Sequence, residues 1–186
     1  MLISNTDLEK KLKIYEELLL KWSSSLNLVA KSTLQGIRTR HFADSLQLVP
    51  FLSAEDRILD LGSGAGFPGM VLAMCGYNVT LLDSDQKKCV FLENVSRETE
   101  TKALIVCSRI ESYMPDEKFD IISARGVASL SKLINLSKGF IKKEHTKGLF
   151  LKGENVDLEL SNLPEDRLYK LPSQINPGSY IIQYQF

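Results

Sequence analysis

Three features that would narrow the function at once are missing from this sequence of 186 residues. Net charge is absent, because 23 basic residues balance 23 acidic ones, so a globally basic nucleic-acid binder is excluded and any polyanion must meet a local patch. The three cysteines form no C-x-x-C pair and only two histidines could join them, so we expect buried reduced thiols and no metal site. An apolar signal segment and a membrane-spanning apolar run are also missing, which predicts a cytoplasmic protein that does not enter a membrane.

The spacing of apolar residues divides the chain into two parts. Spacings of three and four predict a helix over residues 7–22, with Asp7 as its N-cap, and a second helix over about 33–52. After Ser53, short apolar runs predict five strands separated by helices, at 57–61, 78–82, 103–107, 119–124 and 148–152. Helices are expected after the first strand to about Cys75, from an Asp85 cap, over 130–141 and from beyond Gly153 to about 163. Two last runs, 168–171 and 180–184, leave no room for a crossover helix and should pair antiparallel.

This order of elements predicts an α/β fold with a mostly parallel, Rossmann-like sheet of seven strands that ends in an antiparallel pair. Such a sheet is typical of class I methyltransferases, whereas a plain dinucleotide domain lacks the antiparallel end. The length favours one domain over residues 1–186, in which a helical extension over 1–53 packs on the core over 54–186.

A glycine-rich loop over residues 60–69 (DLGSGAGFPG) follows the first predicted strand. Glycine at positions 62, 64 and 66 permits positive φ and lets a ligand approach the main chain. The loop fits two patterns: Gly62-x-Gly64-x-Gly66 after the acidic Asp60 suits S-adenosylmethionine, and Gly64-x-Gly66-x-x-Gly69 suits a dinucleotide. The loop alone leaves both cofactors open.

Acidic residues follow the next two predicted strands and should meet the loop at one edge of the sheet. Asp83 can accept hydrogen bonds from both hydroxyls of a ribose, and Glu111 comes at the position where an adenine edge is contacted. Together with the loop, they predict a cofactor that contains adenosine. Asp60, the antiparallel end and the absence of a substrate domain favour S-adenosylmethionine over a nicotinamide cofactor.

The segment after the fourth strand, residues 123–126 (SARG), bears on the group that is methylated. It lacks the Asn/Asp/Ser-Pro-Pro-aromatic turn of enzymes that methylate exocyclic amines. Cys75 and Cys107 are not placed for attack on a pyrimidine ring, so a covalent mechanism is not expected.

With these segments together, the sequence resembles the glucose-inhibited division protein B family, the bacterial 16S ribosomal RNA guanine-N7 methyltransferases of the small-subunit decoding region. The resemblance spans residues 26–153 and rests on segments 40–46 (RHFADSL), 60–69, 82–84, 108–111, 123–130 (SARGVASL) and 151–153. It implies that S-adenosylmethionine is contacted by Gly62, Phe67, Ile110, Glu111 and Arg125, to which the residue patterns add Gly64, Gly66 and Asp83. It also implies 16S ribosomal RNA or a small-subunit precursor as partner, bound by a monomer.

Guanine N7 carries an in-plane lone pair and no proton, so its methylation needs alignment and not a general base. Arg125 is the predicted catalytic residue, because its donors can hold a carboxylate, guanine O6 or a phosphate oxygen; a structural ion pair is the alternative. A small-molecule or protein methyltransferase, or a nicotinamide-binding module, remains the competing interpretation.

Local basic residues must then bind the RNA. No acidic residue occurs between Glu17 and Asp44, and we expect contacts from Lys31, Arg38, Arg40 and His41, and from Lys152 at the end of the fifth strand. His41 and Asp44, three residues apart, could instead form a hydrogen-bonded pair with each other.

Overall fold

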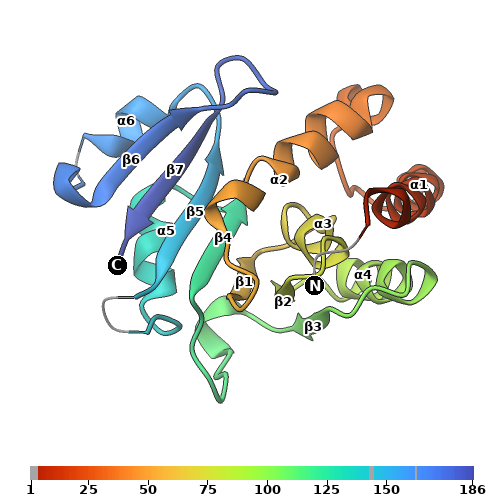
Figure 1. Cartoon of the computed structure of the whole chain (residues 1–186), viewed down its shortest axis with the longest axis horizontal. Helices are drawn as coiled ribbons and strands as arrows, with labels where there is room; N and C mark the ends of the chain where they lie inside the picture. The colour runs from red at the N-terminus through yellow and green to blue at the C-terminus, as the bar shows by residue number, and fades with distance from the viewer. Residues whose placement is uncertain (1–3, 143–144, 162) are drawn as a thin grey trace.

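The computed structural model describes residues 4–142, 145–161 and 163–186, and its centre is a seven-stranded sheet with the order β3-β2-β1-β4-β5-β7-β6 (Figure 1). The strands are β1 (Arg57–Leu61), β2 (Asn78–Asp83), β3 (Leu104–Cys107), β4 (Ile121–Arg125), β5 (Lys147–Lys152), β6 (Leu168–Pro172) and β7 (Tyr180–Gln185). Strands β1 to β5 pair in parallel, whereas β7 pairs antiparallel with both β5 and β6. The predicted fold class is therefore confirmed.

Helices cover both faces of this sheet, as Figure 1 shows. They are α1 (Asn5–Trp22), α2 (Asp44–Leu46), α3 (Gly69–Met74), α4 (Gln86–Glu98), α5 (Leu130–Ser137) and α6 (Val156–Leu160). In β1, Ile58 packs into the cluster with α1, α3 and α4, whereas Leu59 and Leu61 pack into the cluster with α5 and α6. A parallel strand buried on both faces reads as a continuous apolar run, which is why the sequence located β1 well.

The N-terminal segment differs from the prediction of two regular helices. The side chain of Ser4, and not of Asp7, caps α1 by accepting a hydrogen bond from the Asp7 N–H. The region expected as one helix consists of a 3-10 helix (Lys31–Gly36), a π-helix (Arg38–Ala43), the short α2 and a second 3-10 helix (Val49–Phe51). The π-helix, hereafter the π-turn, buries both His41 and Phe42. Tertiary packing has therefore overridden the regular helical period here.

Two later helices are shorter than expected. Helix α5 ends at Ser137, followed closely by Gly139, and α6 covers only five residues. Cys75 and Cys89 are buried as predicted, but Cys107 is exposed because it ends β3, an edge strand of the sheet. Within the described residues, no helix has both the length and the apolar character needed to cross a bilayer.

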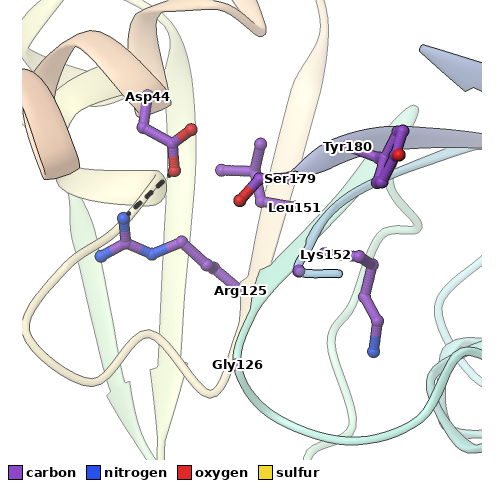
Figure 2. Close-up of a pocket in the computed structure, with 8 residues that line it drawn as sticks. Asp44, Arg125, Gly126, Leu151, Lys152, Ser179 and Tyr180 are labelled. Atoms are coloured by element: carbon purple, nitrogen blue, oxygen red, sulfur yellow. Dashed lines mark hydrogen bonds and ion pairs between the residues drawn. The ribbon is translucent and has the colours of Figure 1, made fainter. Parts of the chain in front are cut away.

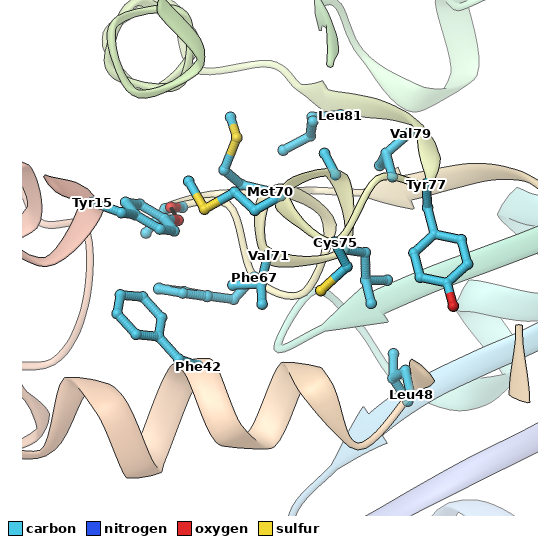
Figure 3. Packing of buried hydrophobic residues seen from close by; sticks show 14 of the residues in the cluster. Tyr15, Phe42, Leu48, Phe67, Met70, Val71, Cys75, Tyr77, Val79 and Leu81 are labelled. Atoms are coloured by element: carbon cyan, nitrogen blue, oxygen red, sulfur yellow. Dashed lines mark hydrogen bonds between the residues drawn. The ribbon is translucent and has the colours of Figure 1, made fainter. Parts of the chain in front are cut away.

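Aromatic rings join the N-terminal segment to the sheet (Figure 3). The Tyr15 ring of α1 stacks on Phe42 at 5.3 Å and on Phe67 of the glycine-rich loop at 5.4 Å, measured between ring centroids. Offset stacking of such buried rings adds to their apolar burial. The glycine-rich loop therefore packs directly against α1 and the π-turn.

A candidate cofactor and acceptor site

The buried carboxylate of Asp60 supports the glycine-rich loop (residues 60–69). Asp60, in β1, accepts hydrogen bonds from the Ser123 hydroxyl of β4 at 2.8 Å and from the Gly69 N–H at 3.2 Å. Burial raises the pKa of Asp60 to about 6, although these hydrogen bonds act in the opposite direction. Asp60 thus fixes the start of the loop to its end and to the neighbouring strand.

Helix α1 also supports the loop, through Tyr15. The Tyr15 hydroxyl donates a hydrogen bond to the Ala65 carbonyl oxygen. Gly66 has a φ of 99°, and a Cβ atom there would lie 2.5 Å from the Tyr15 hydroxyl oxygen. Only glycine fits this position, for both its backbone conformation and its contact with α1.

Asp83, at the carboxyl end of β2, faces the same loop. One carboxylate oxygen accepts the Gly64 N–H at 2.7 Å, and the other accepts the Asp85 N–H at 2.8 Å. Asp85 in turn caps α4 by accepting from the Lys87 and Lys88 N–H groups, as predicted. A carboxylate has about four acceptor positions, so each Asp83 oxygen retains capacity for a ligand hydroxyl.

Two adjoining cavities run along the carboxyl ends of the strands. One, of about 210 Å³, is lined by residues 108–111, which include Ile110 and Glu111. The other, of about 270 Å³, is lined by residues 62–65 with Phe67 and Arg125. Both cavities are lined by Gly62, Asp83 and Val127, so they are neighbours on one continuous edge. This is the edge at which open α/β sheets bind ligands.

The main chain is bare where an adenosine-containing cofactor would lie. Gly64 has a φ of 58°, and a Cβ atom there would meet nothing closer than the Gly62 carbonyl oxygen at 3.7 Å, so it would project into open space along the cavity. Asp83 borders the same cavity, and the exposed Glu111 borders the adjoining one. The donor and acceptor set therefore fits a nucleoside cofactor.

Arg125 ends β4 and is mostly buried. Its guanidinium carbon lies 4.8 Å from the centroid of the Phe67 ring, and its Nη1 donates to the Asp44 carboxylate and to the Arg40 carbonyl oxygen, each at 3.4 Å. Burial lowers the pKa of Arg125, and the charge of Asp44 opposes this shift. The ion pair named as the alternative role of Arg125 is present, but it engages one nitrogen of a group with five N–H donors.

A third cavity, of about 220 Å³, begins at Arg125 (Figure 2). Its walls are Asp44, Arg125 and Gly126 on one side, and Leu151, Lys152, Gly153, Ser179 and Tyr180 on the other. It shares Arg125 and Gly126 with the cavity of about 270 Å³ that residues 62–65 line, hereafter the loop cavity. Arg125 therefore lies at the junction between the cofactor edge and a further cavity with cationic and aromatic walls.

The predicted RNA-binding residues lie in different environments. Lys31 and Arg40 are exposed, and within the described residues neither forms an ion pair. Arg38 pairs with Glu9 and Glu16 of α1 at 2.9 and 2.8 Å. Both glutamates precede the stretch without acidic residues in the sequence, but the fold places them next to Arg38 within it.

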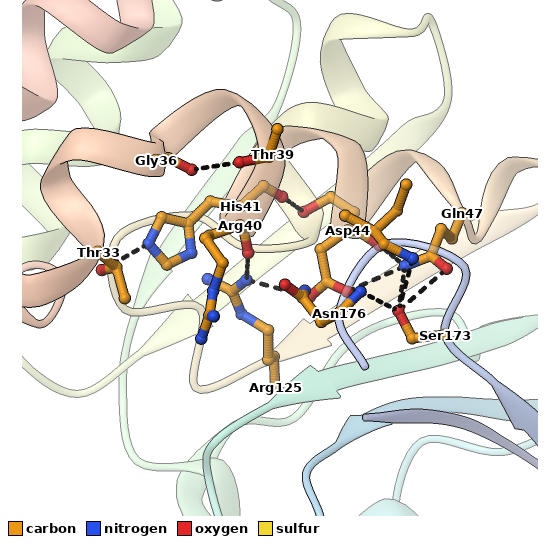
Figure 4. A network of polar contacts seen from close by, with 12 residues as sticks. Thr33, Gly36, Thr39, Arg40, His41, Asp44, Gln47, Arg125, Ser173 and Asn176 are labelled. Carbon is orange, nitrogen blue, oxygen red and sulfur yellow. Dashed lines mark hydrogen bonds and ion pairs between the residues drawn. The ribbon is translucent and has the colours of Figure 1, made fainter. Parts of the chain in front are cut away.

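His41 and Lys152 are already engaged with other groups. His41 does not pair with Asp44; its Nε2 lies 2.9 Å from the Thr33 hydroxyl oxygen, and its ring stacks on Phe67 at 4.9 Å. The Lys152 ammonium donates to the Ala128 carbonyl oxygen at 2.9 Å and pairs with Glu159 at 2.8 Å. The hypothesis of a His41–Asp44 pair is wrong, because the π-turn directs the two side chains to different partners (Figure 4).

The structure thus brings seven of the eight predicted cofactor residues to one edge, and it adds residues that sequence reasoning missed. The eighth, Gly66, is buried against Tyr15 and lines neither cavity. Tyr15 and Gln47 carried no recognisable signal, since Tyr15 contacts Ala65 and Gln47 contacts Ser173, each distant in the chain. Tyr180 carried none because only the folded chain brings it to the third cavity. Asp44 did carry one, because it belongs to the 40–46 segment on which the family resemblance rests. Its partner Arg125 is 81 residues away.

Comparisons with known proteins match the chain to one family. The GidB family, described as rRNA small subunit methyltransferase G, matches residues 8–174. Ribosomal RNA small subunit methyltransferase G of Gluconobacter oxydans is 37% identical over 178 residues, which cover 94% of this chain and 91% of that protein. The protein of the same name from Orientia tsutsugamushi is 41% identical over 180 residues, with 93% and 88% covered.

Solved structures share the fold at low sequence identity. A TehB-like SAM-dependent methyltransferase from Corynebacterium glutamicum superposes with a TM-score of 0.59 at 15% identity and covers 94% of this chain and all of that one. An rRNA methylase from Streptococcus thermophilus has a TM-score of 0.55 at 13% identity, with 77% and 92% covered. These likenesses confirm the class I methyltransferase fold, and the family match together with the two relatives shows that the chain belongs to the GidB family, rRNA small subunit methyltransferase G.

Proposed function

We propose that this chain methylates N7 of a guanine in 16S ribosomal RNA, in the decoding region of the small subunit, by direct in-line transfer from S-adenosylmethionine. The observation that carries the proposal is the position of Arg125, which borders both the loop cavity and the third cavity. One side chain can therefore act on both reactants. Membership of the family supports the reaction class and decides between the two patterns of the glycine-rich loop in favour of S-adenosylmethionine.

We assign the cofactor to the two adjoining cavities at the loop. The residues that line these cavities and would hold it are Gly62, Gly64, Phe67, Asp83, Ile110, Glu111 and Arg125. Gly66, which lines neither cavity, would act indirectly by letting the loop pack against Tyr15. When bound, S-adenosylmethionine supplies an electrophilic methyl group on a positively charged sulfur. The chain contributes hydrogen-bond acceptors at Asp83 and Glu111 and exposed main chain at the loop. Asp60 and Tyr15 hold the loop, and the N–H groups of Gly64 and Asp85 hold the Asp83 carboxylate. Such preorganisation is the main means by which a site without covalent chemistry accelerates transfer.

We assign the guanine to the third cavity. The Tyr180 ring offers an aromatic surface in its wall, and the donors of Arg125 that Asp44 and Arg40 leave unused are available to guanine O6 or a phosphate oxygen. Because N7 has a free lone pair, the chain has to orient the base and exclude water without removing a proton.

The exposed cations Lys31 and Arg40 lie on the segment that ends at Asp44, so we infer that the RNA backbone approaches along it, with Arg38, His41 and Lys152 as further predicted contacts. The packing of α1 residues into the same apolar cluster as α3 and α4 supports a single unit in which residues 1–53 complete the core. We propose a cytoplasmic monomer that needs no metal, with 16S ribosomal RNA or a small-subunit precursor as partner.

The proposal is tested by incubating the purified chain with labelled S-adenosylmethionine and small ribosomal subunits from a strain that lacks the modification. Parallel reactions contain naked 16S ribosomal RNA, or the Arg125→Ala variant as a control. We expect label in one guanine of the small-subunit RNA, identified as N7-methylguanosine by mass spectrometry and mapped by nuclease fragments. Label that appears instead in protein, in small molecules or at another nucleotide atom would overturn the assignment.

A further inference from the structure

The Asp44 carboxylate lies between Arg125 and a glutamine. Asp44 is 6% exposed, one oxygen contacts Arg125 Nη1 at 3.4 Å, and the other accepts a hydrogen bond from Gln47 Nε2 at 2.9 Å (Figure 4). A buried carboxylate needs partners for its remaining lone pairs, and here Gln47 supplies one. The direction in which Asp44 faces is therefore set by two side chains and not by Arg125 alone.

The orientation of the Gln47 amide is fixed by residues that are distant in the sequence but in contact with it. Its Oε1 accepts the Gln174 N–H at 2.7 Å, so the amide nitrogen must face Asp44. The Ser173 hydroxyl lies 3.1 Å from Nε2 and 3.2 Å from Oε1. These two residues belong to the segment between β6 and β7, 126 and 127 residues further along the chain than Gln47.

The same segment forms a wall of the third cavity. The Ser173 N–H donates to the Ser179 carbonyl oxygen at 2.8 Å, which closes a loop over residues 173–179. Ser179 and the following Tyr180 line the cavity opposite Arg125. Hydrogen bonds therefore connect the two walls of the cavity, from Arg125 through Asp44 and Gln47 to the loop.

We propose that Asp44 and Gln47 are positioning residues, which hold the Arg125 guanidinium at the junction of the cavities and couple its position to the 173–179 loop. The inference deepens the proposed function, on which it rests for the role of Arg125. Both contacts to Nη1 are long, so the guanidinium is restrained weakly by each partner, and its orientation depends on where Asp44 is held. A guanine that enters the cavity and moves the loop would thereby also act on Arg125.

The Gln47→Leu variant tests this coupling because it removes the amide's hydrogen bonds to Asp44, Ser173 and Gln174 at nearly constant side-chain volume. We expect the single-turnover rate of methyl transfer to small subunits to fall about 10-fold, since a small misplacement of a catalytic group has effects of this size. The dissociation constant for S-adenosylhomocysteine should stay within about twofold, because Gln47 does not line the cofactor cavities and Arg125 is only one of several residues assigned to hold the cofactor. The matched control is Gln86→Leu, an exposed glutamine, with wild-type values expected.

The Arg125→Ala background separates positioning from a general structural effect. There, Gln47→Leu should cause no further loss of rate, because the group that it positions is absent. An equal loss in both backgrounds, or a loss of S-adenosylhomocysteine binding together with a lower unfolding temperature, would assign Gln47 a structural role and overturn the proposal.

A readout without turnover keeps this test separate from the proposed function. The Nε–H signal of Arg125 in a ¹H–¹⁵N spectrum, assigned by its loss in Arg125→Lys, should shift in Gln47→Leu and in Asp44→Asn but not in Gln86→Leu. An unchanged signal in the first two variants would rule out the positioning role. If the wild-type chain methylates no guanine, the proposed function fails, and this signal still decides whether Asp44 and Gln47 set the position of Arg125.

Discussion

The Tyr15 hydroxyl, on the first helix of the chain, donates a hydrogen bond to the carbonyl oxygen of Ala65 in the glycine-rich loop. Both partners are buried, so neither atom has water as an alternative partner. The contact makes the N-terminal segment a support of the glycine-rich loop, to which we assign the cofactor. Removal of one hydroxyl should therefore change both the stability of the chain and its affinity for the cofactor.

The Tyr15→Phe variant keeps the stacked ring and removes only this donor. We expect the free energy of unfolding to fall by about 1–2 kcal/mol, because the Ala65 carbonyl oxygen is left buried without its partner. Without this contact the loop is less ordered in the free chain, so binding has to order it. A free-energy cost of about 1 kcal/mol for this ordering would raise the dissociation constant of S-adenosylhomocysteine about fivefold. Urea unfolding and titration calorimetry measure the two effects. Tyr169→Phe, at a tyrosine that is 59% exposed, should change neither, and wild-type affinity in Tyr15→Phe would show that the contact does not shape the loop.

The strands, and the edge of the sheet at which the glycine-rich loop, Asp83 and Glu111 meet, could be predicted from the sequence because their signals are local. A parallel strand such as β1 is buried on both faces and reads as an apolar run, and Asp85 caps α4 from the adjacent position. The glycine-rich loop, Asp83 and Glu111 follow strands whose order the crossovers dictate.

The rest of the site depends on contacts between residues far apart in the chain. The sequence predicts that Arg38 contacts RNA, and nothing in its own segment reveals that Glu9 and Glu16 of α1 pair with it in the fold. The irregular 31–51 segment follows from the burial of His41 and Phe42 against Phe67, which no local period encodes. The partnership of Gln47 with Ser173 likewise arises only from the folded chain.

Arg125 is expected to be essential for methylation and dispensable for cofactor binding at high concentration. Arg125→Ala should keep the fold and lower the single-turnover rate at least ~100-fold, the size of a lost preorganised electrostatic contact. Arg125→Lys keeps the charge beside Asp44 but loses the planar set of donors, so we expect a loss nearly as large with better stability. Arg97→Ala, at an arginine whose side chain is 71% exposed, provides the matched control. Near-normal turnover in Arg125→Ala would remove Arg125 from the mechanism.

Arg40 should contribute to RNA affinity in a salt-dependent way. If it neutralises one phosphate, Arg40→Ala weakens binding to 16S ribosomal RNA and reduces the slope of log affinity against log salt by roughly 0.7–0.9. The Glu9→Gln, Glu16→Gln double variant should do the reverse, because it releases Arg38 from its two ion pairs. Filter binding over a series of salt concentrations measures both. Identical slopes in all three proteins would move the RNA surface away from this segment.

His41 should make the stability of the chain sensitive to acid. The Thr33 hydroxyl donates to the Ala30 carbonyl oxygen at 2.7 Å, so the His41 Nε2 must itself donate to Thr33, and the buried Nδ1 carries the lone pair. Within the described residues Nδ1 has no hydrogen-bond partner. Burial, with the nearby charges of Arg125 and Arg40, lowers the pKa of His41 from 6.5 to about 4.

The unfolded chain therefore binds a proton at His41 below about pH 6.5, whereas the folded chain does not until about pH 4. The stabilising contribution is complete above pH 6.5 and is lost as the pH falls to about 4, by up to about 3 kcal/mol. Asp60, whose pKa is raised to about 6, acts in the opposite direction over about pH 4–6, so the profile of the wild-type chain alone is shallow. The difference between the wild-type chain and His41→Gln, measured by urea unfolding at pH 7.5, 6, 5 and 4, isolates the histidine. It should move in favour of the variant as the pH falls, and a difference that stays constant would mean that His41 accepts its proton in the folded state at an ordinary pH.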